Sequence, residues 1–232
     1  MKILCISDLI DPLVYSHNIK ERFSDIDLIL CAGDLPLDYL DFIVSSLNKP
    51  LYFVFGNHHI EEIDYFKKKE APYILIQDER TCCGATHIGT KIIKEEGLII
   101  AGIGGCMQYN RGPNQYSDFR IYLELFKLVP LLLFHRIFHG RALDILLCHA
   151  PPRGIHDRQD LCHRGFKAFL WFMKTFRPKY LIHGHIHLYD LSDVRITQWA
   201  QTTVINAYSH YILHIDTTQT PATEAQQWKT TQ

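Results

Sequence analysis

The sequence lacks the features that mark membrane-spanning, secreted and zinc-finger proteins. None of its 232 residues belongs to an apolar run that reaches the roughly 20 residues needed to span a bilayer. The N-terminal segment has neither the apolar core nor the small-residue cleavage site of a signal peptide, and the seven cysteines form no Cys-x-x-Cys pair. These absences predict a cytoplasmic protein with no membrane partner.

Charge of either sign is not in excess. The 24 lysines and arginines nearly balance the 25 aspartates and glutamates, so the formal net charge is −1 and no general nucleic-acid-binding surface is expected. The hydrophobic fraction of 47% is too high for a disordered chain, and no repeat or flexible linker divides it. We expect one domain over residues 1–216 and a polar, mobile tail over residues 217–232. Composition leaves the oligomeric state open.

Short apolar runs alternate along the chain with longer segments of helical period. Strands are predicted at residues 2–6, 28–31, 51–55, 73–76, 98–103, 145–148, 180–183, 203–206 and 211–215. Helices are predicted at residues 36–47, 61–69, 118–138 and 161–176. Several of the strands are continuously apolar, which is typical of strands covered on both faces. This order predicts an α/β layered fold in which helices cover the sheets.

Polar residues follow five of the predicted strands directly, and many of them are histidines, of which the chain has 14. In chain order they are Asp8, Asp34, Asn57 with His58 and His59, His149, and His185 with His187. Ligands of α/β sheets bind beyond the carboxyl ends of the strands, so we expect these side chains to converge at one edge. Oxygen and nitrogen donors without cysteine suit Mn, Fe, Zn, Co or Ni.

Each of these residues also has an ordinary structural explanation when it is taken alone. Asp8 could cap a turn after its strand, Asn57 could occupy a turn position that tolerates a left-handed backbone, and His149 could be a core histidine. Polar side chains gathered at five strand ends are costly unless they bind something. Together they therefore favour a metal site.

With these motifs the chain resembles the calcineurin-like metallophosphoesterase superfamily. The family motifs are, in order, D-x-H, G-D, G-N-H-[DE], a lone His and G-H-x-H. They correspond to Asp8-Leu9-Ile10, Gly33-Asp34, Gly56-Asn57-His58-His59, His149 and Gly184-His185-Ile186-His187. The resemblance covers residues 1 to about 216. It implies a four-layer α/β/β/α sandwich of two mixed sheets, with two divalent metal ions at the carboxyl-end strand tips.

The resemblance also implies a role for each motif residue. The first ion would take Asp8, Asp34 and His187, and the second would take Asp34, Asn57, His149 and His185. A hydroxide formed at the two ions would attack phosphorus. His58 would protonate the leaving group or stabilise the phosphoryl oxygens. The run from His149 to Asp157 is similar to the branch with cyclic-nucleotide phosphodiesterase-like enzymes, so the implied substrate is a small phosphate ester, more often a phosphodiester.

Two positions depart from the family pattern. Ile10 replaces the histidine of D-x-H, so the first ion loses a ligand that Asp11, His17 or water could replace. His59 replaces the carboxylate that would orient His58. Besides a two-metal enzyme, a one-metal enzyme and a binding scaffold with degraded metal chemistry therefore remain open.

Four further side chains are weaker candidates for binding the substrate. They are His59, Arg111, Arg153 and His156. The loop that holds Arg111 could bind a phosphate or a base, although a Gly-Pro turn before a helix capped near Ser117 explains it better. The segment that holds Arg153 and His156 could equally be a surface loop.

Overall fold

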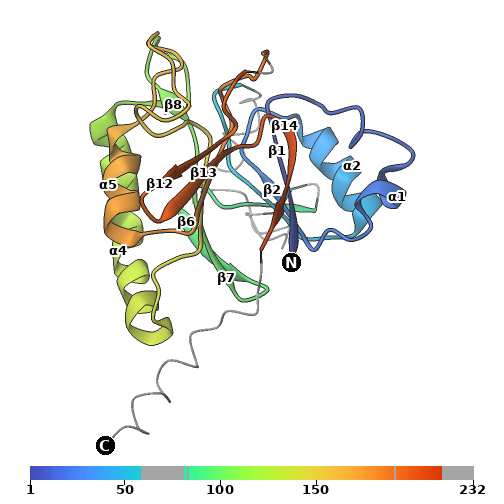
Figure 1. Ribbon diagram of the computed structural model, residues 1–232, viewed down its shortest axis with the longest axis horizontal. Helices are drawn as coiled ribbons and strands as arrows, with labels where there is room; N and C mark the ends of the chain where they lie inside the picture. Colours follow the sequence, from blue (N-terminus) through green and yellow to red (C-terminus); the bar gives the residue numbers. More distant parts are fainter. Residues whose placement is uncertain (59–80, 83, 191, 216–232) are drawn as a thin grey trace, which may run out of the picture.

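The computed structural model of the protein describes residues 1–58, 81–82, 84–190 and 192–215 (Figure 1). The predicted elements at residues 61–69 and 73–76, the tail at 217–232 and His59 lie outside the described residues. None of the described helices combines the length and the apolar character required to cross a membrane.

Two six-stranded mixed sheets form the centre of the protein. The first contains, in spatial order, β14 (Ser209–His214), β1 (Lys2–Ser7), β2 (Leu28–Cys31), β3 (Leu51–Phe53), β5 (Ala85–His87) and β4 (Thr81–Cys82). The second contains β12 (Ile196–Trp199), β13 (Thr202–Asn206), β11 (Tyr180–His183), β10 (Ile145–Cys148), β7 (Leu98–Ile103) and β6 (Lys91–Glu95). In each sheet the four inner strands are parallel and both edge strands are antiparallel. A small sheet pairs β8 (Cys106–Met107) with β9 (Gln115–Tyr116).

Helices cover the outer face of each large sheet, as Figure 1 shows. The first sheet is covered by α1 (Ile19–Phe23) and α2 (Leu37–Leu47), and the second by α4 (Asp118–His139) and α5 (Lys167–Phe176). Because strand side chains alternate between faces, Leu4 and Ile6 of β1 pack under the helices. Ile3 and Cys5 pack between the two sheets. Apolar side chains are therefore needed on both faces of the sheet. The predicted four-layer α/β/β/α sandwich is confirmed.

The predicted helix at residues 161–176 is wrong in its first turns, because α5 begins at Lys167. Residues 161–166 form a loop that pairs with the chain after β10. Phe166 has an extended backbone, donates to Pro151 and accepts from the amide of Arg153. A β-carbon on Gly165 would lie 2.4 Å from the carbonyl oxygen of Pro152, so the two segments are in close contact.

The prediction also missed seven short elements. These are α1, β4, β5, β6, β8, β9 and β12, none of which exceeds five residues.

Candidate metal centre

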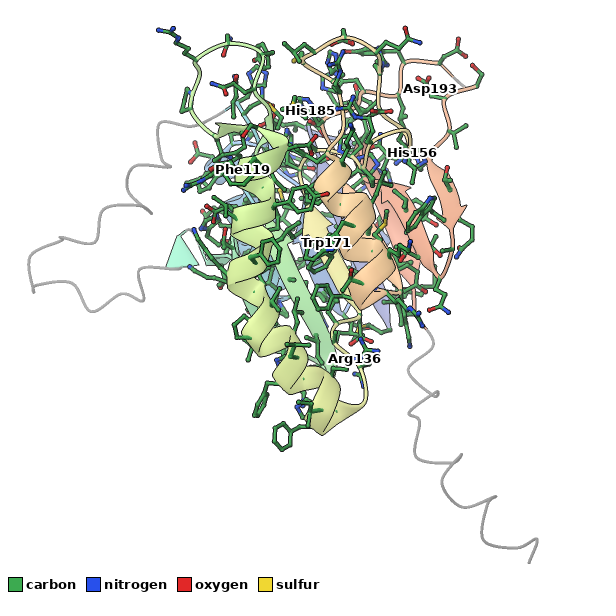
Figure 2. The ribbon with its side chains drawn as sticks, turned by 90° about the vertical axis from the view of Figure 1, so that its left-hand side faces the viewer. Phe119, Arg136, His156, Trp171, His185 and Asp193 are labelled. Carbon is green, nitrogen blue, oxygen red and sulfur yellow. The ribbon has the colours of Figure 1, made fainter. Side chains whose placement is uncertain are left out.

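The parallel strands of both sheets end at one edge of the sandwich, where the chain turns sharply. Asp8 follows β1, Asp34 lies after β2 and His185 lies after β11, and their φ angles are 62°, 57° and 66°. The amide of His185 donates to both carboxylate oxygens of Asp8, at 3.0 and 2.9 Å. This contact joins the two sheets, so polar side chains from both meet at the edge where Figure 2 labels His185.

Two glycines are required for this close approach. A β-carbon on Gly56 would lie 2.0 Å from Oδ1 of Asp34 and 2.5 Å from Cε1 of His149. A β-carbon on Gly184 would lie 2.4 Å from Oδ2 of Asp8. Any side chain at either position would displace the carboxylate that it meets.

Four of the predicted ligands converge on one point. Asp34, His149 and His185 each offer one ligand atom, and the three atoms lie within 4.8 Å of one another. Nε2 of His149 is 3.2 Å from Oδ1 of Asn57 and 3.3 Å from Oδ2 of Asp34. Two oxygen and two nitrogen donors from four strand ends can thus face a common ion.

The two histidines are oriented by backbone carbonyl groups. Nδ1 of His149 donates to the carbonyl of Ala32 at 2.8 Å, and Nε2 of His185 donates to the carbonyl of Cys162 at 2.9 Å. These bonds assign one proton to each ring, so Nε2 of His149, once its own proton is lost, and Nδ1 of His185 are the nitrogens that can face an ion. Metal-bound histidines commonly donate their second ring nitrogen in this way. The arrangement therefore fits a divalent cation.

The neighbouring protein groups shift the pKa values of Asp34, His149 and His185 in the metal-free centre. Burial raises the pKa of Asp34, but the charge and hydrogen bond of His149 outweigh it and hold that pKa well below its usual range. Burial lowers the pKa of His149, yet the Asp34 carboxylate and, less strongly, Asp8 raise it to about 9. Burial, followed by the nearby charge of His149, lowers the pKa of His185 to about 3. A protonated His149 thus lies where an ion would meet Asp34.

Asp8 and His187 form a second, more open half of the site. Nε2 of His187 is 3.9 Å from Oδ1 of Asp8. The Asp8 side chain is buried, whereas that of His187 is 39% exposed. Nδ1 of His187 is hydrogen-bonded to the hydroxyl of Tyr189, and its ring lies 4.9 Å from that of Tyr208. Two tyrosines therefore hold the imidazole facing Asp8.

Among the described residues, neither predicted substitute for the histidine missing at position 10 is joined to the other proposed ligands by a hydrogen bond or ion pair. Ile10 is 43% exposed. The carboxylate of Asp11 is instead bound by Ser209, His210 and the amide of Leu13. His17 is exposed, and among the described residues no hydrogen bond or ion pair joins it to the predicted ligands.

A family model described as calcineurin-like phosphoesterase matches residues 1–189. The chain belongs to the calcineurin-like phosphoesterase family. Members bind divalent metal ions, and Asp34, His149 and His185 form a group able to hold one.

Solved structures share the fold of this calcineurin-like phosphoesterase at low sequence identity. One aligns with a TM-score of 0.61 at 15% identity, over 91% of this chain and 94% of that chain. TT1561 of Thermus thermophilus has a TM-score of 0.59 at 14% identity, over 90% and 89% of the two chains. GAP50, the anchor in the inner membrane complex of Plasmodium, has a TM-score of 0.50 at 12% identity, over 89% and 70%. No curated protein sequence matches the chain.

The remaining candidate residues of this phosphoesterase lie in different settings. His58 is exposed, and its amide donates to Oδ1 of Asp34 at 2.8 Å. Arg111 is exposed between β8 and β9, and among the described residues no hydrogen bond or ion pair joins it to the centre. Arg153 is half-buried, with Nε 3.9 Å from Oδ2 of Asp157.

His156 is not brought to the centre. Its Nδ1 donates to Nε2 of the buried His183 at 2.9 Å, and its Nε2 accepts from the hydroxyl of Thr197 at 2.8 Å. Nδ1 of His183 in turn donates to the carbonyl of Gly184. This chain of hydrogen bonds supports the turn that carries His185.

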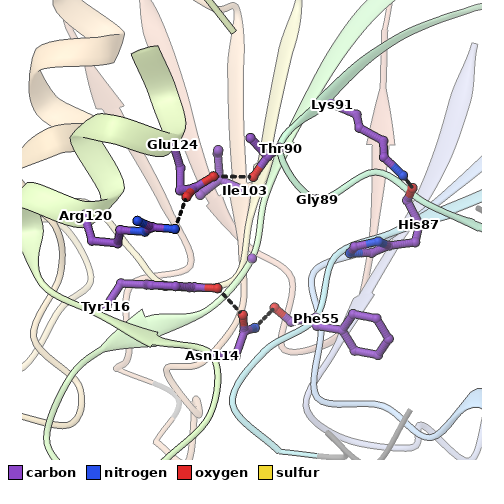
Figure 3. Close-up of a pocket in the computed structure, with 11 residues that line it drawn as sticks. Phe55, His87, Gly89, Thr90, Lys91, Ile103, Asn114, Tyr116, Arg120 and Glu124 are labelled. Atoms are coloured by element: carbon purple, nitrogen blue, oxygen red, sulfur yellow. Dashed lines mark hydrogen bonds and ion pairs between the residues drawn. The ribbon is translucent and has the colours of Figure 1, made fainter. Parts of the chain in front are cut away.

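Several groups that support the centre were not predicted from the sequence. The loop before β9 contributes Asn114, whose amide donates to the carbonyl of Phe55 at 3.0 Å and whose carbonyl accepts from Tyr116 at 2.7 Å (Figure 3). This contact holds the turn that contains Gly56. The phenol of Tyr109 lies beside Asn57, and burial raises its pKa. The only sequence signal for these residues was that their loop follows a predicted strand.

Proposed function

We propose that this calcineurin-like phosphoesterase hydrolyses a small phosphate ester, preferentially a phosphodiester, with two divalent metal ions such as manganese. The observation that carries the proposal is the convergence of Asp34, Asn57, His149 and His185 at the ends of four parallel strands. Both histidines direct one ring nitrogen to this point and donate the other to a backbone carbonyl. Such orientation is typical of metal ligands.

In this proposal the ligands divide between two ions that share one carboxylate. Asp8, Asp34 and His187 would hold the first ion, and Asp34, Asn57, His149 and His185 would hold the second. Bound divalent ions would neutralise charge on the phosphoryl oxygens and acidify a water for attack on phosphorus. Asp34 suits the shared position because its two oxygens face different partners. Oδ1 accepts from the amide of His58, and Oδ2 faces His149.

His58 is the proposed catalytic residue. Its amide is tied to Asp34, which holds the backbone beside the centre, while its side chain is exposed to solvent and to an entering substrate. An imidazole in that place can protonate the departing alkoxide or stabilise charge on the phosphoryl oxygens. Arg111 and Arg153 remain proposed contacts for the substrate. His156 is not retained, because both of its ring nitrogens bind protein groups.

The preference for diesters rests on sequence similarity alone. The run from His149 to Asp157 is similar to the cyclic-nucleotide phosphodiesterase-like branch of the family. The test compares bis(p-nitrophenyl) phosphate with p-nitrophenyl phosphate as substrates of the manganese-loaded protein. Faster hydrolysis of the monoester would overturn the diester preference and leave the metal chemistry intact.

The decisive variants are Asn57→Ala and His58→Ala. Both are expected to abolish hydrolysis, but only Asn57→Ala is expected to weaken metal binding, because His58 is not a proposed ligand. His214→Gln is the matched control, since this exposed histidine on β14 is not among the proposed ligands. Unchanged hydrolysis in both alanine variants would refute the assignment.

A one-metal enzyme is the second candidate, and the asymmetry of the site favours it. The ligand atoms of the second ion are buried and close together, whereas the first ion depends on the exposed His187 and lacks a ligand at Ile10. Metal analysis after dialysis separates the possibilities. One retained ion per chain with full turnover supports a one-metal enzyme. No retained ion and no turnover with any divalent metal supports a binding scaffold.

A further inference from the structure

Helix α4 packs on the second sheet through one stripe of side chains. The buried stripe consists of Ile121, Leu125, Leu128 and Leu132, which are spaced four, three and four residues apart. This is the spacing of a single helix face. All four belong to the core beneath the helix, so the opposite side of α4 faces away from the protein.

The opposite side of α4 carries large apolar side chains where a surface helix ordinarily carries charge. Eight of them are between 39% and 75% exposed. They are Phe119, Leu123, Phe126, Leu131, Leu133, Phe134, Ile137 and Phe138. They make up half of the sixteen large apolar side chains that are exposed among the described residues.

This apolar surface is long as well as concentrated. A helix of 22 residues is about 33 Å in length. Figure 2 shows α4 and α5 side by side, with Phe119 towards one end of α4, Arg136 towards the other and Trp171 on α5. The rings of Phe126 and Trp171 are 5.1 Å apart, which continues the surface onto α5. Contiguous apolar surfaces of this kind mark interaction sites.

The charged residues of α4 and of the adjoining α5 with its C-cap are mainly basic. Six of them are Arg120, Lys127, Arg136, Lys167, Lys174 and Arg177. The two acidic residues of α4 contact protein groups, since Asp118 accepts from two amides at the start of α5 and Glu124 forms ion pairs with Arg120 and Lys127, two of these six. Helices α4 and α5 with the C-cap Arg177 thus have a formal net charge of +4 in a chain of net charge −1. The glutamates of the β6–β7 turn, with Lys94, lower this only to +3.

An anionic lipid surface matches both properties. Apolar side chains of a surface helix enter the interface of a bilayer, and flanking lysines and arginines meet anionic headgroups. A second copy of this chain matches only the apolar stripe, because two such faces would bring like charges together. We propose that the exposed side of α4, here termed the α4 face, docks onto the surface of an anionic lipid bilayer.

The proposal replaces the expectation of no membrane partner, which rested on the lack of a spanning segment. A helix that lies in the plane of the surface needs no such segment. It is also independent of the proposed hydrolytic function, since no residue of the α4 face belongs to the metal centre.

Vesicle flotation of the full chain tests the proposal. One set of vesicles contains phosphatidylcholine alone, and the other contains about a third phosphatidylglycerol, as in a strongly anionic leaflet. We expect binding to the anionic vesicles only, and weaker binding at high salt. Ile137→Ser combined with Phe138→Ser should weaken it about tenfold or more, because both side chains would leave the interface. Arg136→Glu should weaken it about fivefold or more.

Matched controls alter similar residues elsewhere. Val194→Ser with Ile196→Ser removes an exposed apolar pair near β12, and Lys20→Glu reverses a charge on α1. Both control proteins should bind like the wild type, and all variants should keep their far-UV circular dichroism. Equal binding by the α4 variants and the wild type, or no vesicle binding at all, would overturn the proposal. A third outcome would also overturn it: light scattering shows a dimer, the double variant Ile137→Ser with Phe138→Ser is monomeric, and neither protein binds lipid.

Discussion

The ion pair between His149 and Asp34 should make metal binding depend on pH. The pKa of His149 is raised to about 9, because the attraction of the Asp34 carboxylate outweighs the effect of burial. At neutral pH the imidazole is therefore protonated in the metal-free protein. A metal ligand must be neutral, so an entering ion has to displace this proton. The Asp34 carboxylate is ionised and His185 is neutral over the same range, because the pKa of each is lowered.

The sign and the size of the effect follow from this competition. Below a pKa of about 9 the proton competes with the ion, so affinity should rise about tenfold per pH unit and level off above that value. At pH 7 the competition weakens binding about 100-fold, or about 2.7 kcal/mol, relative to the plateau. Binding should release close to one proton per ion at His149.

Isothermal titration calorimetry of the metal-free protein with Mn²⁺ can measure both quantities. Titrations between about pH 6.5 and pH 8.5, in buffers of different ionisation enthalpy, give the affinity and the number of protons released. His149→Gln should bind more weakly and lose the pH dependence, because glutamine does not titrate. His214→Gln should behave like the wild type. A wild-type affinity that stays constant over this range, with no proton release, would refute the reasoning.

Three further substitutions have clear expected outcomes. Gly56→Ala should remove bound metal and activity, as measured by elemental analysis and hydrolysis, because the added β-carbon would meet Asp34 at 2.0 Å. Asp144→Ala should lower the free energy of unfolding in urea by about 2–3 kcal/mol, since the buried carboxylate accepts from the amide of Ile99 and from Arg141. Ile10→His should raise the affinity for the first ion, because it restores the histidine of the family motif. Leu9→His, at an equally exposed neighbouring position, should leave that affinity unchanged.

The inner strands and long helices could be predicted from the sequence because their burial leaves a continuous pattern. The strands at 28–31, 98–103, 145–148 and 180–183 match the structure residue for residue. Their apolar runs are long enough to specify a strand covered on both faces. The short strands at the sheet edges carry no such signal, because their pairing depends on the partner strand. The turns before α5 were misassigned for the opposite reason, since Phe166 is apolar and buried without being helical.

The convergence of the ligands was predictable from residue type and strand order. The groups that orient those ligands were not. Five strand tips with oxygen and nitrogen donors can meet only if the strands run parallel, and the inner strands do. The carbonyls of Ala32 and Cys162 orient the histidines, yet every residue has a carbonyl, so no sequence pattern distinguishes them. Likewise, Tyr189 and Tyr208 reach His187 only through the folded chain.

Three of the proposed metal ligands lie on a strained backbone. Asp8, Asp34 and His185 all have left-handed backbones, which cost about 1–2 kcal/mol each for a residue other than glycine. A chain shaped by stability alone would place glycine there, as it does at Gly33 directly before Asp34. The strain is retained because each turn directs a carboxylate or imidazole into the shared edge instead of along the strand. Local sequence preference and the fold therefore disagree where the ligands lie, which is typical of a functional site.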